Sequence, residues 1–158
     1  MEENIVLSNK VINVLAEKLA KLINQYYSKA IFLTFSNGGL PTCYALATNG
    51  LKFIPTVFSF DPKEESSISI TGWLVHKIYE IYQHESSPIV IIDDILDTGV
   101  TIQNFETKFE LVFPTFFLVD KQGEHRKYTP RTVYSGLEIQ TNRWVDFPWG
   151  DTKKKNNF

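Results

Sequence analysis

The chain has 158 residues, of which 43% are hydrophobic and 22% are charged, and its formal net charge is −2 at pH 7. This length is that of one ordinary domain, and the composition excludes an intrinsically disordered chain. The near balance of positive and negative charge argues against a protein that holds a nucleic acid polymer by its overall positive potential.

The cysteine count and the lengths of the apolar runs further limit the classes of protein to which the chain can belong. The single cysteine, Cys43, excludes an intramolecular disulfide and any metal cluster held by cysteines alone. The first residues, MEENIVL, are acidic and lack the basic and apolar regions of a signal peptide. No apolar run reaches the roughly 20 residues that span a bilayer. We therefore expect a cytoplasmic protein without stable membrane insertion.

Apolar periodicity, capping residues and turn residues predict helices that alternate with strands. The first helix runs from Ser8, a suitable N-cap, to about Tyr27 and has an apolar face at helical spacing. The further expected elements are, in chain order, a strand at Ala30–Phe35, a helix from Pro41 to Asn49, a strand at Phe53–Phe60, an exposed loop at Asp61–Ile70, a helix around Leu74–Tyr82, a strand at Ile89–Ile92, a helix at Thr101–Glu110, and strands at Thr115–Val119 and Thr132–Tyr134. Residues 1–150 are expected to form one domain, followed by a flexible basic tail at 151–158.

Strands that are apolar on both faces and alternate with helices are typical of an α/β domain with a mostly parallel sheet. In such sheets, ligands bind where strands end and loops diverge. The candidate functional residues therefore lie at the ends of the predicted strands, and three of these ends are informative.

The segment at the end of the third predicted strand is acidic and then turns into a helix. Residues 91–101 are Ile-Ile-Asp-Asp-Ile-Leu-Asp-Thr-Gly-Val-Thr. The adjacent carboxylates would repel one another unless a cation or hydroxyl donors lay nearby, which suits a sugar diol with Mg²⁺. The Asp-Thr-Gly turn presents backbone N–H groups at a helix start, where they can cradle a phosphate. Two alternatives are simple helix capping by Asp97 or Thr98, and a D-D-x-x-D metal site, which would need an all-helical protein. The length of the pattern favours the phosphate interpretation.

This segment resembles the signature of type I phosphoribosyltransferases that binds phosphoribosyl pyrophosphate (PRPP). The resemblance implies their α/β fold, a single domain with a mostly parallel central sheet flanked by helices and a small C-terminal hood. It implies that Asp93 and Asp94 hold the ribose hydroxyls of PRPP. It also implies that the 5′-phosphate is wrapped by Asp97, Thr98, Gly99, Val100 and Thr101.

The end of the first predicted strand supplies a second, weaker indication. The family places a pyrophosphate-binding loop here, and the resemblance gives this role to Ser36, Asn37, Gly38 and Gly39. Glycines let the backbone come close to an anion, and the N–H groups that follow can donate to it. Two glycines before a helix are more often a simple turn, so this assignment depends on the first motif.

The third strand end lies near the C-terminus, where residues 144–149 are Trp-Val-Asp-Phe-Pro-Trp. A similar stretch occurs in the 6-oxopurine branch of the family, and it implies that Trp144 stacks on the purine and that the Val145 backbone meets the purine edge. Trp149 is expected to be a hydrophobic plug. The same branch has a lysine where Lys121 stands, which would recognise the 6-oxo group and disfavour adenine. A surface lysine is an equally good interpretation of Lys121 from the sequence alone.

The implied reaction moves the 5-phosphoribosyl group of PRPP to guanine, xanthine or hypoxanthine and releases pyrophosphate, as in purine salvage. Asp97 would be the catalytic residue that accepts a proton from the purine N7. The implied cofactor is Mg²⁺, with Asp94 and Asp146 as ligands, and it would neutralise charge on the leaving group. Relatives are usually dimers or tetramers, so a homo-dimer or homo-tetramer is expected.

Several positions depart from the family pattern. Asn37 stands where close relatives have a basic residue, Phe60 where they commonly have tyrosine, and Gly150 where an acidic residue is usual. The segment Asp61–Gly72, expected to close over the site, has fewer basic residues than its counterparts. These departures leave a second hypothesis, a PRPP-binding or nucleotide-binding regulatory protein that has weak turnover or none.

Overall fold

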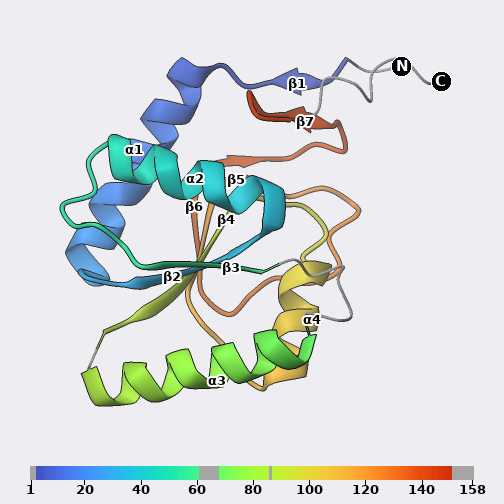
Figure 1. Ribbon diagram of the computed structural model, residues 1–158. Coiled ribbons are helices and arrows are strands. Elements are labelled where there is room, and N and C mark those ends of the chain that lie inside the picture. The colour runs from blue at the N-terminus through green and yellow to red at the C-terminus, as the bar shows by residue number, and fades with distance from the viewer. Residues whose placement is uncertain (1–2, 61–67, 86, 151–158) are drawn as a thin grey trace.

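A five-stranded sheet forms the centre of the computed structural model, which describes residues 3–60, 68–85 and 87–150 (Figure 1). The strand order is β3-β2-β4-β5-β6, and every neighbouring pair is parallel. The strands are β2 (Ile31–Phe35), β3 (Val57–Phe60), β4 (Ile89–Leu96), β5 (Thr115–Lys121) and β6 (Val133–Ile139). The predicted α/β fold is confirmed.

Helices cover both faces of this sheet. They are α1 (Asn9–Tyr26), α2 (Ser36–Thr48), α3 (Ile68–Glu85) and α4 (Val100–Phe109). Figure 1 shows α1 and α2 on one side and α3 and α4 on the other. Successive side chains of β2 alternate between two cores: Phe32 packs in the core beneath α1 and α2, and Leu33 in the core beneath α3 and α4. The apolar residues on both faces of the sheet are therefore covered by helices.

The predicted elements are present, and the ends of several differ from the prediction. Helix α1 begins as expected, because the Ser8 hydroxyl accepts a hydrogen bond from the Val11 N–H. Strand β4 continues to Leu96, so the acidic pair lies within the strand instead of after it. Helix α3 includes residues 68–70 of the predicted loop, and residues 61–67 lie outside the described part of the chain, as does the predicted tail at 151–158.

The prediction that the second helix begins at Pro41 is wrong, because α2 begins five residues earlier, at Ser36. The first turn of α2 lies so close to the sheet that a Cβ atom on Gly39 would stand 1.3 Å from the Thr34 Oγ1. Only glycine allows this approach. The expected glycine loop is therefore the first turn of a helix, and its free N–H groups lie at the end of β2.

A second, two-stranded sheet joins the two ends of the domain. Strand β1 (Ile5–Val6) pairs in parallel with β7 (Val145–Asp146), and the Ile5 N–H donates to the Trp144 carbonyl over 2.8 Å. Figure 1 shows this pair at the edge of the molecule, beyond α2. The sequence pattern did not predict β1. None of the helices in the described ranges is long and apolar enough to cross a membrane.

The order of the strands determines where the candidate site lies. From β2 the chain moves to one side, to β3, whereas from β4 it moves to the other side, to β5 and β6. The neighbours β2 and β4 therefore flank the point where the chain changes direction, and ligands of open parallel sheets bind there, beyond the carboxyl ends of the strands. The glycines of α2 and the acidic segment of β4 meet at this point.

Candidate active site

The two carboxyl groups of the acidic pair of β4 lie in a desolvated position. Burial raises the pKa of Asp93 well above its usual range, and the neighbouring Asp94 carboxylate adds to the shift. Burial also raises the pKa of Asp94, against the effect of its hydrogen bonds. Among the described residues no lysine or arginine forms an ion pair with either carboxylate. The pair is therefore short of positive charge.

We expect Asp93→Asn to stabilise the fold at neutral pH. Folding raises the pKa of Asp93, so the folded state holds this proton more tightly than the unfolded state. The charge thus lowers the free energy of unfolding as the pH rises from about 4, the unfolded pKa, through the folded pKa. Removing it should raise the melting temperature at neutral pH by about 2–4 °C or more, the equivalent of 1 kcal/mol in a chain of this size.

The measurement is thermal unfolding of both proteins across the acid range, and the gain should vanish towards about pH 4. Asp120→Asn is the matched control, because Asp120 forms an ion pair with Arg126 and its loss should destabilise the protein at neutral pH. A loss of stability in Asp93→Asn at neutral pH would contradict the expectation.

The Asp94 side chain lies between two segments that are far apart in the sequence. A Cβ atom on Gly38, in the first turn of α2, would stand 2.3 Å from the Asp94 carboxylate. The Trp149 Nε1 donates to the Asp94 Oδ2 over 3.3 Å, and its ring stacks on Phe147. Trp149 is therefore packed as expected for a plug, and it also has a polar role that the sequence analysis missed. The predicted pyrophosphate segment and the acidic strand end do meet.

The turn from β4 into α4 depends on a glycine at position 99. Gly99 caps α4 with a φ of 78°, in the left-handed region that favours glycine, and a Cβ atom there would stand 2.0 Å from the Tyr128 carbonyl oxygen. No side chain caps the helix, although the Thr98 Oγ1 accepts from the Val100 N–H over 3.3 Å. The capping alternative is therefore not supported for Asp97, and for Thr98 it is limited to this one bond to the first N–H of the helix. Thr101 lies exposed in the first turn of α4.

Lys121 is buried and forms an ion pair, so the surface interpretation is wrong. It is the last residue of β5, its side chain is 4% exposed, and its Nζ lies 3.1 Å from the Asp97 Oδ1. The parallel strands β4 and β5 are neighbours, and the Asp97 turn follows directly after the end of β4. Two of the proposed site residues thus form one charge pair.

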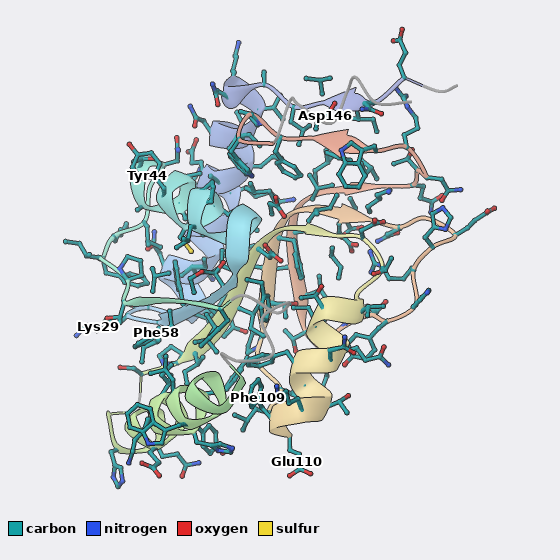
Figure 2. All side chains as sticks on the ribbon, turned by 45° about the vertical axis from the view of Figure 1, so that its right-hand side comes forward. Lys29, Tyr44, Phe58, Phe109, Glu110 and Asp146 are labelled. Atoms are coloured by element: carbon teal, nitrogen blue, oxygen red, sulfur yellow. The ribbon has the colours of Figure 1, made fainter. Side chains whose placement is uncertain are left out.

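Trp144 and Val145 are held by the N-terminal segment. Trp144 is 63% exposed and its carbonyl is bound by β1, whereas Val145 is buried. Figure 2 labels Asp146 at the β1–β7 pair. The Asn4 side-chain amide donates to the Asp146 Oδ2 over 3.0 Å. No hydrogen bond or ring contact in the described ranges joins Trp144 to Lys121 or Asp97. The base-binding role of these residues stays a prediction.

The donor chemistry of the acidic pair fits Mg²⁺ in part. Mg²⁺ prefers oxygen ligands and is usually held by one or two carboxylates, with substrate phosphates and waters completing its shell. Asp94 offers such a carboxylate at the end of the sheet, beside the first turn of α2. Within residues 3–60, 68–85 and 87–150 no group of three or more acidic, histidine or cysteine side chains forms a metal cage. Such a site would thus depend on the substrate for its remaining ligands.

Arg126 is a residue of the site that the sequence analysis missed. Its Nε donates to the Asp97 carbonyl over 2.8 Å, and its Nη2 donates to the carbonyls of Leu96 over 3.0 Å and Lys121 over 2.8 Å. The same Nη2 forms an ion pair with the buried Asp120. A signal was present: Asp120 directly follows the apolar run at 116–119, a carboxylate buried there needs a cation, and Arg126 is six residues away.

Comparison with known proteins identifies the fold. No protein-family model matches the chain, and no curated protein matches it in sequence. A hypothetical protein from Neisseria gonorrhoeae with bound ppGpp has a TM-score of 0.67 at 15% identity, over 96% of this chain and 93% of that one. A purine phosphoribosyltransferase from Pyrococcus horikoshii has a TM-score of 0.61 at 16% identity, over 95% of each chain. A xanthine-guanine-hypoxanthine phosphoribosyltransferase from Helicobacter pylori has a TM-score of 0.60 at 16% identity, over 99% of this chain and 97% of that one. The chain has the fold of the type I purine phosphoribosyltransferases, with 6-oxopurine enzymes among its structural neighbours.

Proposed function

We propose that the protein is a purine phosphoribosyltransferase that moves the 5-phosphoribosyl group of PRPP to a 6-oxopurine and releases pyrophosphate. The observation that carries this proposal is the ion pair of Lys121 and Asp97 at the carboxyl ends of two neighbouring strands. One group is a donor and the other an acceptor, and they lie 3.1 Å apart. The phosphate turn begins at the same aspartate.

The spacing of this pair suits one edge of a purine. In guanine, O6 and N7 lie side by side on the same edge. An ammonium donates to O6, while a carboxylate beside it faces N7 and can accept the N7 proton. Adenine presents an amino group in place of O6, which is a donor and would oppose the Lys121 ammonium. The pair thus favours 6-oxopurines, and exposed Trp144 offers a face for stacking.

The remaining groups would bind PRPP along the end of the sheet. The turn at 97–101 would hold the 5′-phosphate by its N–H groups, Asp93 and Asp94 would accept from the ribose hydroxyls, and the first turn of α2 would donate to the pyrophosphate. When bound through Asp94 and the substrate, Mg²⁺ would neutralise charge on the leaving pyrophosphate. A role for Asp146 as a second ligand is part of the proposal.

In the reaction a purine ring nitrogen forms a bond to C1′ of the ribose while the bond from C1′ to the pyrophosphate oxygen breaks. Positive charge develops on the sugar ring, as in glycoside hydrolysis. The purine loses a proton, which Asp97 accepts, and Lys121 stabilises the negative charge that develops on O6.

The test follows pyrophosphate release from PRPP and Mg²⁺ with guanine, xanthine, hypoxanthine or adenine. We expect turnover with at least one 6-oxopurine and much less with adenine. No release with any base, from a folded protein that binds a purine mononucleotide, would overturn the proposal.

That outcome would favour a second function, a nucleotide-binding protein without turnover. The protein from N. gonorrhoeae has ppGpp bound and aligns over nearly the whole of both chains. Asn37 and Phe60 also depart from the pattern of the enzymes. Binding of ppGpp and of purine mononucleotides should be measured beside the turnover assay. We expect binding together with turnover for an enzyme, and binding without turnover for a nucleotide-binding regulatory protein.

A further inference from the structure

The segment that follows β5 lies across the phosphate turn. Residues 126–128, which we call the strap, bind three consecutive carbonyl groups at the end of β4 and in this turn. The first two belong to Leu96 and Asp97, and both accept from the guanidinium of Arg126, over 3.0 and 2.8 Å. The rigid, planar guanidinium thus fixes two neighbouring peptide groups at once.

The strap backbone completes the contact. The N–H groups of Lys127 and Tyr128 both donate to the Thr98 carbonyl, over 2.9 and 3.0 Å. The Tyr128 carbonyl then lies directly over Gly99, which has no Cβ atom to obstruct it. The Tyr128 hydroxyl donates to the buried Glu106 of α4. The strap is therefore bound both to the turn and to the helix behind it.

Holding the carbonyls on one side determines where the N–H groups point. In a planar trans peptide the C=O and the following N–H point in opposite directions. With the carbonyls of residues 96–98 facing the strap, the N–H groups of Asp97, Thr98 and Gly99 face away from it. In the described part of the chain none of these three N–H groups has a hydrogen-bond acceptor. They are available to an external anion.

The same arginine fixes the second half of the site. Arg126 is 15% exposed and pairs with Asp120, which is 9% exposed, and its Nη2 also donates to the Lys121 carbonyl. Asp120 and Lys121 are the last two residues of β5. One guanidinium therefore joins the turn after β4 to the strand end that carries the lysine.

We propose that Arg126 is a positioning residue: it turns the carbonyls of the phosphate turn away from the ligand and keeps the N–H groups of the turn aimed at a phosphate. This inference rests on the proposed function for the identity of the ligand, a sugar 5-phosphate. Arg126 spends its donors on main-chain carbonyls and on Asp120, so the proposal gives it no contact with PRPP or the base. Its loss should therefore weaken phosphate binding more than base binding, because Lys121 is also held by the pairing of β5 with β6.

The test compares Arg126→Lys and Arg126→Ala with the wild type. The lysine keeps the charge but cannot bind three carbonyls and a carboxylate as a planar fork. We expect the KM for PRPP and the dissociation constant for ribose 5-phosphate to rise about tenfold or more in both variants, because charged hydrogen bonds are lost. The KM for the base should change much less, and guanidinium ions should restore part of the PRPP affinity of Arg126→Ala.

Arg131→Ala is the matched control, because Arg131 is exposed and close in sequence, and it should leave both constants unchanged. Asp120→Asn keeps the shape of the side chain that pairs with Arg126 but removes its charge. It should raise the same two constants by a smaller factor, which provides a test if Arg126→Ala does not fold. A folded Arg126→Lys with unchanged affinity for PRPP and ribose 5-phosphate would overturn the inference.

Ribose 5-phosphate binding by calorimetry separates this inference from the proposed function. If the wild type binds this probe but turns over no base, only the enzyme proposal fails, and weaker binding by the Arg126 variants still supports the positioning role. If the wild type turns over a 6-oxopurine and the variants differ only in melting temperature, the positioning role fails and the enzyme proposal stands.

Discussion

Asp97→Asn should reduce kcat with every purine by about 10²–10⁴-fold, the usual contribution of a positioned acid or base. The amide has the size of the carboxylate but cannot accept the N7 proton. The main-chain bond from Arg126 to the Asp97 carbonyl does not involve the side chain, so the phosphate turn should keep its shape. The KM for PRPP should therefore change far less than kcat.

A matched variant separates catalysis from stability. Asp97→Asn removes the partner of Lys121, a cation that is 4% exposed, and an unpaired buried charge is destabilising. Adding Lys121→Met should restore the melting temperature while leaving the double variant inactive. Pyrophosphate release and thermal unfolding of the three proteins give both readouts. Near-normal turnover by Asp97→Asn would show that the site is misplaced.

Both members of this pair were predicted as site residues from the sequence, although their contact was not. The signature around Asp97 is local: apolar residues, two carboxylates, a turn with glycine and a helix start follow one another along a short segment. A strand, turn and helix start of this kind depend on strand periodicity and turn residues, which can be recognised in the sequence. Lys121 could be placed only by resemblance, because its burial depends on the neighbouring strand.

The features that the sequence did not predict are contacts between distant segments. Nothing in the residues of β1 indicates that they pair with β7, about 140 positions later. The start of α2 was placed too late because Pro41 is a favourable first residue of a helix and Gly38 and Gly39 are typical of turns. Both glycines are instead in the helix, because their close packing against β2 and β4 outweighs this turn preference. The net charge of −2 argued against binding of a nucleic acid polymer. It carries no information about a small anion, because a few N–H groups are enough to bind one.

Gly39→Ala should destabilise the protein by about 1–3 kcal/mol, the range for inserting a methyl group into a well-packed site. The added Cβ would stand 1.3 Å from the Thr34 Oγ1, 2.7 Å from the Thr34 Cβ and 3.0 Å from the Ile92 carbonyl oxygen. Thr34 is fully buried, so it has little room to move. Helix α2 must therefore shift away from the sheet. Thermal unfolding measures the loss, which corresponds to about 2–4 °C per kcal/mol.

The sign of the stability change in Gly39→Ala is informative, because the steric clash of the new methyl group and the higher helix propensity of alanine act in opposite directions. Gly39 has a negative φ inside α2, so alanine should gain about 1 kcal/mol from helix propensity if the helix did not press on the sheet. Gly150→Ala, where the nearest atom to the new Cβ is the Phe147 carbonyl oxygen at 3.1 Å, should change stability much less. Adding Thr34→Ala to Gly39→Ala should recover part of the loss, because it removes the closest atom. A stabilised Gly39→Ala would mean that the first turn of α2 stands off the sheet, and the proposed pyrophosphate donors would then not lie beside Asp94.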